Sequence, residues 1–504
     1  MVEALRPGGI QWGSRQARWI IAATVGASAL AMLDATAVNV AIPAIGSDLR
    51  AGVGGLQWTV NGYTLSLASL ILLSGALADR FGRRLIFQVG IAWFAIASLM
   101  CSLAPTLEVL IAARVLQGIG GALLTPGSLA IIQVSFVPGD RGRAIGTWSG
   151  LGGVAAAIGP LLGGWLVEAG SWRAVFWINL PVAAVVVWIA ARHVPESRAE
   201  AGGAAHFDIP GAVLGALGLG AATWALIAAG DRGASLVVVA AAVAGILGLG
   251  AFLLVEHGAR APLVPLGLFE SRQFSGVNLV TFVVYAGMSV LFFLLVVYLQ
   301  NVAGYSPIRA GTALIPVTLL MLILSARAGA LAERIGPRRL MTIGPLAMAV
   351  GMLLLAPIGE KVSYAAHVLP GVIVFGLGLS ATVAPLTATV LAAVDPRNAG
   401  IASGVNNAVA RTAALLGVAV LPVASGLTGD AFRDAVRFHR GFGISMTLSA
   451  ALMVVGGTLA WIAIRDKSAT GKPACNQRQV SRHTFCAIDG PPLEPASRDL
   501  NVPS

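Results

Sequence analysis

The stretch Gly-Ala-Leu-Ala-Asp-Arg-Phe-Gly at Gly75 to Gly82 returns as Gly-Ala-Leu-Ala-Glu-Arg-Ile-Gly at Gly329 to Gly336. Six of the eight positions are identical, and the two differences preserve acidic charge and apolar bulk. Each copy closes a long apolar segment and leads into further arginines. Parallel repeats within an apolar chain are one way in which membrane proteins build a pseudo-symmetric pathway. The repeat therefore predicts a membrane protein made of two related halves.

The composition of the chain indicates a lipid environment. Of its 504 residues, 57% are hydrophobic and 11% are charged, with a mean hydropathy of +0.84, whereas soluble domains carry about 25% charged residues. A helix needs about 20 apolar residues to cross the hydrocarbon core. Fourteen segments meet that criterion, near residues 18–46, 56–78, 85–104, 107–135, 143–168, 172–194, 208–230, 234–256, 274–301, 307–331, 338–358, 364–391, 397–427 and 441–464.

The repeat pairs the second segment with the tenth, which is an offset of eight helices. A simple duplication of a six-helix unit would give an offset of six helices. We therefore predict an all-α integral membrane fold of two pseudo-symmetric six-helix bundles plus two inserted helices, 14 transmembrane helices in all. Gly211 and Gly215 have small-xxx-small spacing, so the inserted pair is expected to associate through close backbone contact at the periphery. The expected parts are an N-terminal tail at 1–16, six-helix bundles at 17–195 and 273–465, the inserted pair at 207–257 and a disordered tail at 466–504.

The distribution of positive charge predicts the orientation in the cell membrane. Counted over alternate loops, the side that holds both termini carries sixteen Lys and Arg residues before the C-terminal tail, and the opposite side carries eight. Because positive residues accumulate on the cytoplasmic side, both termini are expected to be cytoplasmic. This bias explains the net charge of +11 without nucleic acid, since binding to nucleic acid would need a basic soluble domain.

The sequence favours an ion gradient as the source of energy. None of the three lysines follows the spacing of a phosphate-binding loop, and the Gly-rich strings lie inside apolar segments. No catalytic constellation, cofactor motif or metal-ligand cluster is recognisable, and the three cysteines are too scattered for a disulfide framework. We therefore expect no enzyme activity, no cofactor and no metal.

Asp34 is the only carboxylate well inside any of the fourteen segments. A charge at the bilayer centre costs about 2.5–3.5 kcal/mol on insertion scales, so it is expected to be paired, protonated or facing water. Arg114 is the natural partner, and its own options are Asp34, Gln117 one turn further on, or backbone carbonyls of the first helix. Two interpretations follow: Asp34 carries a proton, or the pair permanently locks the first helix to the fourth.

Further polar residues within the segments suggest a cavity. Arg327 is close enough to a helix end to reach the cytoplasmic interface. Arg411 lies deeper, where it either lines the cavity or bonds to neighbouring amides. The candidate cavity residues are Asn39, Asn61, Tyr63, Asn278, Tyr285, Asn406, Asn407 and Arg411.

Two glycine-containing motifs suggest moving or tightly packed parts. Gly159, Pro160, Gly163 and Gly164 combine a missing backbone donor with a surface free of side chains, which indicates a hinge or a tight seal. The repeated stretch places small and charged residues at the cytoplasmic rim, with Gly75 expected to permit close helix approach, and we assign it to gating rather than to a simple positive anchor. Its candidate residues are Gly75, Asp79, Arg80, Gly82, Arg83, Gly329, Glu333 and Arg334.

These motifs together resemble the major facilitator superfamily and, within it, the fourteen-helix drug:proton antiporter family. The segments concerned are 33–43 in the first helix, 75–84 after the second, 114–118 in the fourth, 159–164 in the fifth and 171–181 at the entry to the sixth. The resemblance implies that Asp34 couples protons, that Arg114 takes part in proton transfer and that the fifth-helix motif distinguishes exporters from importers. Ala155 departs from the longer fifth-helix pattern, which often has Gly there.

The resemblance implies a proton-coupled efflux antiporter that exports lipophilic drugs, antibiotics or related metabolites by alternating access. Because no additional mid-membrane acid is present in the later helices, we expect a neutral or monocationic substrate, and we expect a functional monomer. The alternatives are a proton-coupled importer of a metabolite, a non-transporting membrane sensor and, less favoured, a membrane-embedded enzyme.

Overall fold

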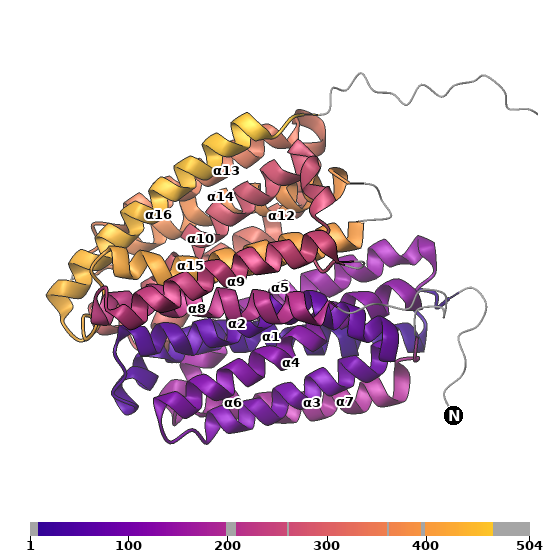
Figure 1. The fold of residues 1–504 in the computed structure, drawn as a ribbon, viewed down its shortest axis with the longest axis horizontal. Coiled ribbons are helices and arrows are strands. Elements are labelled where there is room, and N and C mark those ends of the chain that lie inside the picture. Colours follow the sequence, from indigo (N-terminus) through magenta and orange to yellow (C-terminus); the bar gives the residue numbers. More distant parts are fainter. Residues whose placement is uncertain (1–8, 198–207, 260–261, 360–361, 395–398, 467–504) are drawn as a thin grey trace, which may run out of the picture. The chain divides into compact units, whose positions relative to one another are not determined.

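The computed structural model describes residues 9–197, 208–259, 262–359, 362–394 and 399–466. The regular elements of these residues are helices, apart from an isolated bridge between Ile10 and Phe136. The helices (Figure 1) are α1 Arg15–Asp48, α2 Val53–Phe81, α3 Arg83–Ser102, α4 Leu107–Ser135, α5 Pro138–Ala169, α6 Ala174–Trp177, α7 Asn179–His193, α8 Ile209–Arg232, α9 Leu236–Gly258, α10 Arg272–Asn301, α11 Pro307–Thr312, α12 Ile315–Ile335, α13 Pro337–Leu355, α14 Leu369–Ala392, α15 Ala399–Ala424 and α16 Ala435–Ala463, with short turns η1 Leu266–Glu270 and η2 Tyr364–Val368.

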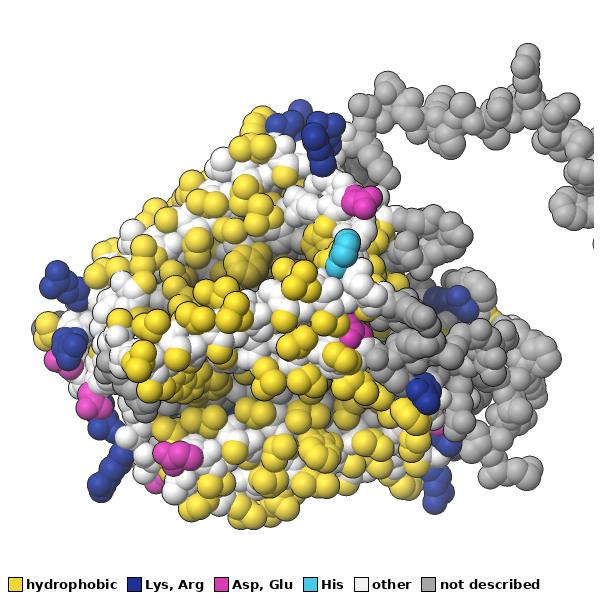
Figure 2. Space-filling view, viewed as in Figure 1, with side chains coloured by type: hydrophobic (Ala, Val, Ile, Leu, Met, Phe, Trp, Pro, Cys, Tyr) yellow, Lys and Arg dark blue, Asp and Glu magenta, His cyan; other side chains and the backbone are white. Residues whose placement is uncertain are grey.

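Twelve helical segments of the described residues are long and apolar enough to cross a membrane. Helices α2 and α5 have 29 and 32 residues and are not among these twelve. The total of fourteen spans is therefore not confirmed and stays a prediction. In the space-filling view, hydrophobic side chains cover the middle of the visible face and most charged side chains lie toward its ends (Figure 2), as a bilayer requires.

The two halves repeat the same helix packing. In the N-terminal half α1 packs on α5 and α7, and α4 packs on α2 and α3. In the C-terminal half α10 packs on α15 and α16, and α14 packs on α12 and α13. The predicted pseudo-symmetry is therefore present in the backbone.

The last glycine of the repeated stretch has the same conformation in both halves. Gly82 ends α2 and begins α3 with a φ of 118°, and Gly336 ends α12 and begins α13 with a φ of 89°. Residues other than glycine rarely adopt a positive φ of this size. A connection of one residue between two helices therefore favours glycine at that position. The repeat in the sequence thus records a repeated tight turn.

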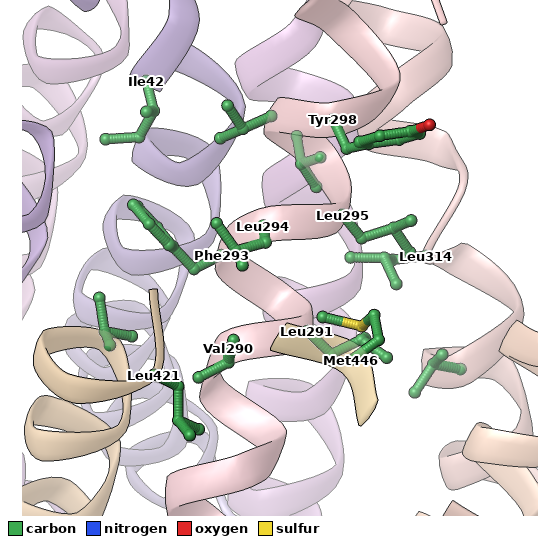
Figure 3. Packing of buried hydrophobic residues seen from close by; sticks show 14 of the residues in the cluster. Ile42, Val290, Leu291, Phe293, Leu294, Leu295, Tyr298, Leu314, Leu421 and Met446 are labelled. Carbon is green, nitrogen blue, oxygen red and sulfur yellow. The ribbon is translucent and has the colours of Figure 1, made fainter. Parts of the chain in front are cut away.

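Hydrophobic side chains of α10 form much of the core. Leu291, Leu294 and Leu295 have no exposed surface, and Figure 3 shows them among side chains from neighbouring helices. Of the 18 consecutive residues of α10 with the highest mean hydropathy, 67% are buried, compared with 11% for α9. Helix α10 therefore belongs to the interior, whereas the apolar surface of α9 is available to lipid.

The inserted helices α8 and α9 pack on each other, and α8 also contacts α2 and α15. The predicted close contact lies one turn further on than expected. A Cβ on Gly211 would meet the capping carboxylate of Asp208, whereas Cβ atoms on Gly218 and Gly245 would lie 2.8 and 2.6 Å from backbone nitrogens of the partner helix. The small-residue spacing predicted the correct helix. Several glycines of α8 have this spacing, however, and only the packing of the two helices determines which of them lie at the contact. The tail predicted at 466–504 lies outside the described residues from 467 onward.

Candidate functional site: a buried ion pair in the N-terminal half

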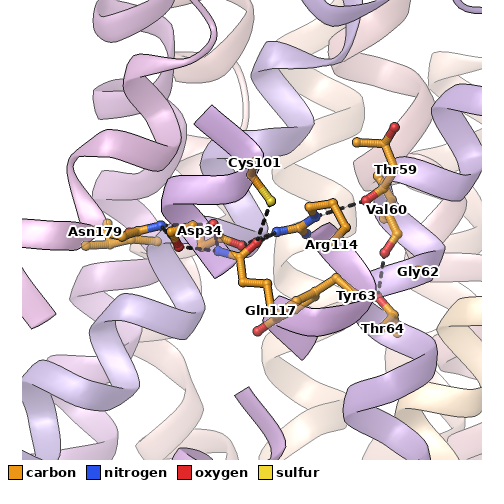
Figure 4. Close-up of polar contacts among 12 residues, drawn as sticks. Asp34, Thr59, Val60, Gly62, Tyr63, Thr64, Cys101, Arg114, Gln117 and Asn179 are labelled. Atoms are coloured by element: carbon orange, nitrogen blue, oxygen red, sulfur yellow. Dashed lines mark hydrogen bonds and ion pairs between the residues drawn. The ribbon is translucent and has the colours of Figure 1, made fainter. Parts of the chain in front are cut away.

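A carboxylate and a guanidinium meet inside the N-terminal half (Figure 4). Asp34 of α1 and Arg114 of α4 are each 1% exposed, and Arg114 Nη1 lies 2.6 Å from Asp34 Oδ2. Gln117, one turn after Arg114, donates from Nε2 to Asp34 Oδ1 at 2.8 Å and accepts from Arg114 Nη1. Two of the partners that the sequence offered to Arg114 are therefore used together.

Further residues complete this network from other helices. Asn179 Nδ2 donates to Asp34 Oδ1 at 3.1 Å and to the Ser98 hydroxyl at 3.2 Å. Arg114 Nε donates to the backbone carbonyl of Thr59 at 3.0 Å, so its backbone partner lies on α2 and not on the first helix as expected. The sequence did not identify Ser98, Asn179 or Thr59 as site residues. Polar side chains in apolar helices were the available signal for Ser98 and Asn179.

Aromatic rings cover the guanidinium. The Arg114 Cζ atom lies 4.4 Å from the ring centroid of Tyr63 and 5.8 Å from that of Phe176. Cation–π contact of this kind stabilises a desolvated guanidinium. With both Asp34 oxygens bonded and both side chains hidden from solvent, the pair can exchange a proton with water only after the network opens.

The glycine motif of α5 lies directly against α1, next to Asp34. A Cβ on Gly159 would collide with the Thr36 hydroxyl, and a Cβ on Gly163 would lie 2.8 Å from the Cα of Ala37. Gly164 faces the other half, where a Cβ would lie 2.6 Å from the Cα of Ile308. The motif therefore allows α5 to touch α1 on one side and α11 on the other, and the expected tight packing is present.

The repeated stretch has a more limited structural role than the sequence suggested. Among the described residues, no atom lies within 4 Å of a Cβ built on Gly75, and the Ala384 side chain, at 3.8 Å, is the one that approaches a Cβ on Gly329. Gly75 therefore makes no close helix contact in this conformation, and its assignment to gating stays a prediction. Arg80 and Arg334 are exposed, and the side chains of Asp79 and Glu333 lie outside those that the structure describes.

Glu196 anchors the connection between α2 and α3 and was missed in the sequence. Its carboxylate accepts from the backbone N–H groups of Arg84 at 3.1 Å and Leu85 at 3.2 Å, while Arg83 N donates to the carbonyl of Ser197. A carboxylate is favourable at a helix N-terminus, where unpaired donors and the helix dipole point toward it. A Cβ on Gly82 would lie 2.7 Å from Glu196 Oε1, so the carboxylate would have to shift if this residue carried a side chain.

Several candidate cavity residues of the C-terminal half bond to one another instead. Asn406 of α15 donates to Asn278 Oδ1 at 3.0 Å and to the Thr281 hydroxyl at 2.8 Å, both on α10. These bonds hold α10 to α15. Arg411 Nε donates to Asn407 Oδ1 one turn earlier, at 3.1 Å, so of the two amides considered from the sequence only Asn407 is its partner.

Two of the candidates in the N-terminal half have a buried polar atom without a hydrogen-bond partner among the described residues. Asn61 is 1% exposed, and its Nδ2 has no hydrogen-bond partner among the described residues, and the same holds for Oδ1 of Asn39. Arg411 lies on α15, which packs on both α2 and α10.

The hydrogen bonds that join described residues of the two halves lie at the distal side, which we define as the ends of α1 and α5 and the starts of α2 and α11. There Val53 N donates to the carbonyl of Gly429, Gln57 to that of Val418 and Gln300 to that of Val40. Ile308 N donates to Glu168 at 3.0 Å. The halves are therefore fastened together on the side opposite the predicted cytoplasmic side.

Comparison with known sequences identifies the family. Residues 24–418 match the family model of the Major Facilitator Superfamily. The chain belongs to this superfamily. A puromycin resistance protein of Streptomyces alboniger is 36% identical over 463 residues, covering 89% of this chain and 92% of the relative. A tetracenomycin C resistance and export protein of Streptomyces glaucescens is 36% identical, covering 84% of this chain and 79% of the relative.

Solved structures agree with this assignment. A bacterial homolog of the human lysosomal transporter Spinster, crystallised in an inward-facing and unoccupied conformation, matches with a TM-score of 0.64 at 17% identity, covering 90% of this chain and 98% of that chain. A D-xylose–proton symporter matches with a TM-score of 0.63 at 15% identity, covering 89% and 97%. At such identities the likeness shows the fold alone. The chain is thus a multi-pass membrane protein of the major facilitator superfamily, which comprises transporters and not enzymes.

Proposed function

We propose that this protein is a proton-coupled efflux antiporter that exports small lipophilic drugs or antibiotics by alternating access. The observation that carries the proposal is the buried pair of Asp34 and Arg114, a titratable group at membrane depth with a charged partner. Relatives named for antibiotic resistance and export support efflux as its direction.

Protonation of Asp34 is the proposed coupling step. A neutral carboxyl no longer compensates the charge of Arg114, and a buried charge left without its partner costs about 3–5 kcal/mol. The network must therefore rearrange when the proton arrives. Reformation of the ion pair then requires that the proton leave.

Helix α5 provides a path from this pair to the contact between the halves. Asp34 lies one turn before Ala37, which touches Gly163, and the adjacent Gly164 touches Ile308 of the other half. A movement of α1 on protonation would therefore press on the distal contacts of α5. This arrangement links the charge of one side chain to which side of the membrane is open.

The membrane potential makes such coupling sufficient for uphill transport. One charge that crosses 100 mV is worth about 2.3 kcal/mol, which corresponds to a concentration ratio of about fifty at about 1.4 kcal/mol per decade. A single titrating carboxylate can thus drive export. The distal fastening between the halves corresponds to a state open toward the predicted cytoplasmic side, where substrate would enter.

Inside-out membrane vesicles test the proposal. When the lumen is made acidic, wild-type protein is expected to accumulate tetracenomycin C, the compound for which one relative is named, inside the vesicles against its gradient, and Asp34→Asn is expected to abolish accumulation. The matched control is Asp48→Asn, which removes an exposed acid from the end of the same helix. Acid-driven accumulation by Asp34→Asn at the wild-type rate would contradict proton coupling through Asp34, and acid-driven release of substrate would indicate the importer instead.

A further inference from the structure

Arg411 carries a charge that no acidic residue of its own half can balance from membrane depth. No Asp or Glu occurs between residues 396 and 429, which include the whole of α15. The acids of the C-terminal half nearest in sequence, Asp395 and Asp430, lie outside α15 at its two ends. A compensating acid would have to come from the other half of the molecule or from a ligand.

The contacts of Arg411 leave most of its guanidinium unused. Among the described residues its hydrogen bond is the one from Nε to Asn407, and no carboxylate lies within the 4.0 Å of an ion pair. Helix α15, which carries Arg411, packs on α2 and α10, the helices of Tyr63 and Tyr285. Its side chain is also partly exposed, in contrast to the 1% exposure of Arg114.

Asp34 does not supply the missing charge. Both of its oxygens are already bonded, Oδ2 to Arg114 and Oδ1 to Gln117 and Asn179. The pair of Asp34 and Arg114 is neutral as a unit. The centre of the protein therefore has a net positive charge at Arg411.

A second unpaired polar group lies on the helix that faces α15. Gln57 donates to the carbonyl of Val418 and Val53 N donates to that of Gly429, so the start of α2 lies beside the end of α15 and the two helices run antiparallel. Starting from the Gln57–Val418 bond and moving toward the predicted cytoplasmic side, Asn61 lies one helical turn along α2. Arg411 lies two turns along α15 in the same direction. Asn61 is 1% exposed and its amide nitrogen has no partner among the described residues. A buried donor without a partner is costly unless a ligand satisfies it.

We infer that Arg411, with the Asn61 amide, binds an anionic oxygen group of the substrate: a carboxylate, phenolate or enolate on an otherwise lipophilic molecule. The inference rests on the proposed function, because it names the substrate class of that transporter. A guanidinium is permanently charged and presents paired donors that match such groups. The same charge repels a cation, so the monocationic substrate expected from the sequence is disfavoured.

A pair of dyes of similar shape tests the charge preference. Fluorescein methyl ester is a monoanion at pH 8, and rhodamine 123 is a monocation built on the same ring system. Binding of each to the purified full-length protein is measured by fluorescence polarisation without any gradient. Wild type is expected to bind the anion at least about tenfold more tightly, because a charge-assisted hydrogen bond contributes one decade or more.

Three variants assign that preference to one residue. Arg411→Gln is expected to remove the preference, and Arg411→Lys to retain part of it, since the charge remains but the planar fork is lost. Arg327→Gln, an exposed arginine of α12, is the matched control and is expected to bind both dyes as wild type does. Equal affinity for the dyes in wild type, a preference for the cation, no binding of the anion, or an unchanged preference in Arg411→Gln would each contradict the inference.

Binding without a gradient separates this inference from the proposed function. Binding of the anion with no acid-driven accumulation in vesicles would support the substrate class and contradict proton-coupled efflux. Acid-driven accumulation of rhodamine 123 alone would support efflux and contradict the substrate class.

Discussion

The two halves share a backbone plan but differ in the chemistry of their central arginines. Arg114 is sealed, paired with Asp34 and covered by Tyr63. Arg411, on α15 of the other half, bonds to Asn407 and has no acid beside it among the described residues. The comparison teaches that the duplication repeated the scaffold and not the site. One half can hold the proton-exchanging group while the other remains free to recognise the substrate.

The largest expected effect comes from breaking the charge pair. Asp34→Asn or Arg114→Gln alone leaves one buried charge unpaired, which is expected to lower stability by about 3–5 kcal/mol. The double variant removes both charges and is expected to recover most of that loss, because a neutral pair needs no compensation. Thermal unfolding of the detergent-solubilised protein, followed by size-exclusion chromatography, measures all three.

That outcome distinguishes a true pair from two independent side chains. If the losses of the two single variants simply added in the double variant, the ion pair seen in the structure would contribute nothing of its own.

A second comparison contrasts Gly163 of α5, which is closely packed against α1, with Gly75 of α2, which has free space around it. Gly163→Ala places a methyl group 2.8 Å from the Cα of Ala37, and overpacking of this kind costs about 1–3 kcal/mol. Gly75→Ala meets no atom of the described residues within 4 Å and replaces a poor helix former with a good one, so stability is expected to stay equal or rise. The same unfolding assay measures both variants.

Transport by the Gly75 variant then tests gating separately from packing. Wild-type transport by a stable Gly75→Ala protein would show that this position has no part in gating. Equal stability of the two alanine variants would contradict the contact between α1 and α5.

A smaller effect is expected at the α2–α3 connection. Glu196→Ala removes the acceptor of two backbone N–H groups, and loss of such a cap costs about 1 kcal/mol. Faster hydrogen exchange at Arg84 and Leu85, measured by mass spectrometry, is the expected result. Unchanged protection of these amides would show that the connection holds itself together without Glu196.

The smallest effect is expected at the distal rim. Arg173 Nη1 lies 2.6 Å from Asp48 Oδ2, with 34% and 48% of the side chains exposed, and exposed pairs contribute little. Asp48→Asn is therefore expected to change neither thermal stability nor acid-driven transport appreciably. A loss as large as that of Asp34→Asn would mean that any acid of α1, and not its buried position, determines the behaviour.

The sequence was sufficient for the features that depend on local pattern. Apolar run length, the repeat and the single mid-membrane acid predicted the helices, the two halves and Asp34, because each is readable within one segment. Gln117 was also accessible, since it lies one helical turn from Arg114.

Features that depend on which helices meet were not readable. Ser98, Asn179 and Glu196 join their sites only because α3, α7 and the segment after α7 pack beside α1, α2 and α4. The amides of Asn278 and Asn406 were expected in a cavity, and they bond between α10 and α15 instead, because composition cannot tell a lining residue from a clamp. Whether Asp34 carries a proton or only locks two helices depends on chemistry that neither pattern nor packing decides.

The double variant Asp34→Asn/Arg114→Gln decides that question most directly. In inside-out vesicles with an acidic lumen, the central claim predicts a folded protein that lets substrate equilibrate but does not accumulate it against a gradient, because no titrating group remains in the pair. Accumulation at the wild-type level by this variant would show that the pair is only a structural lock, and would contradict proton coupling through Asp34.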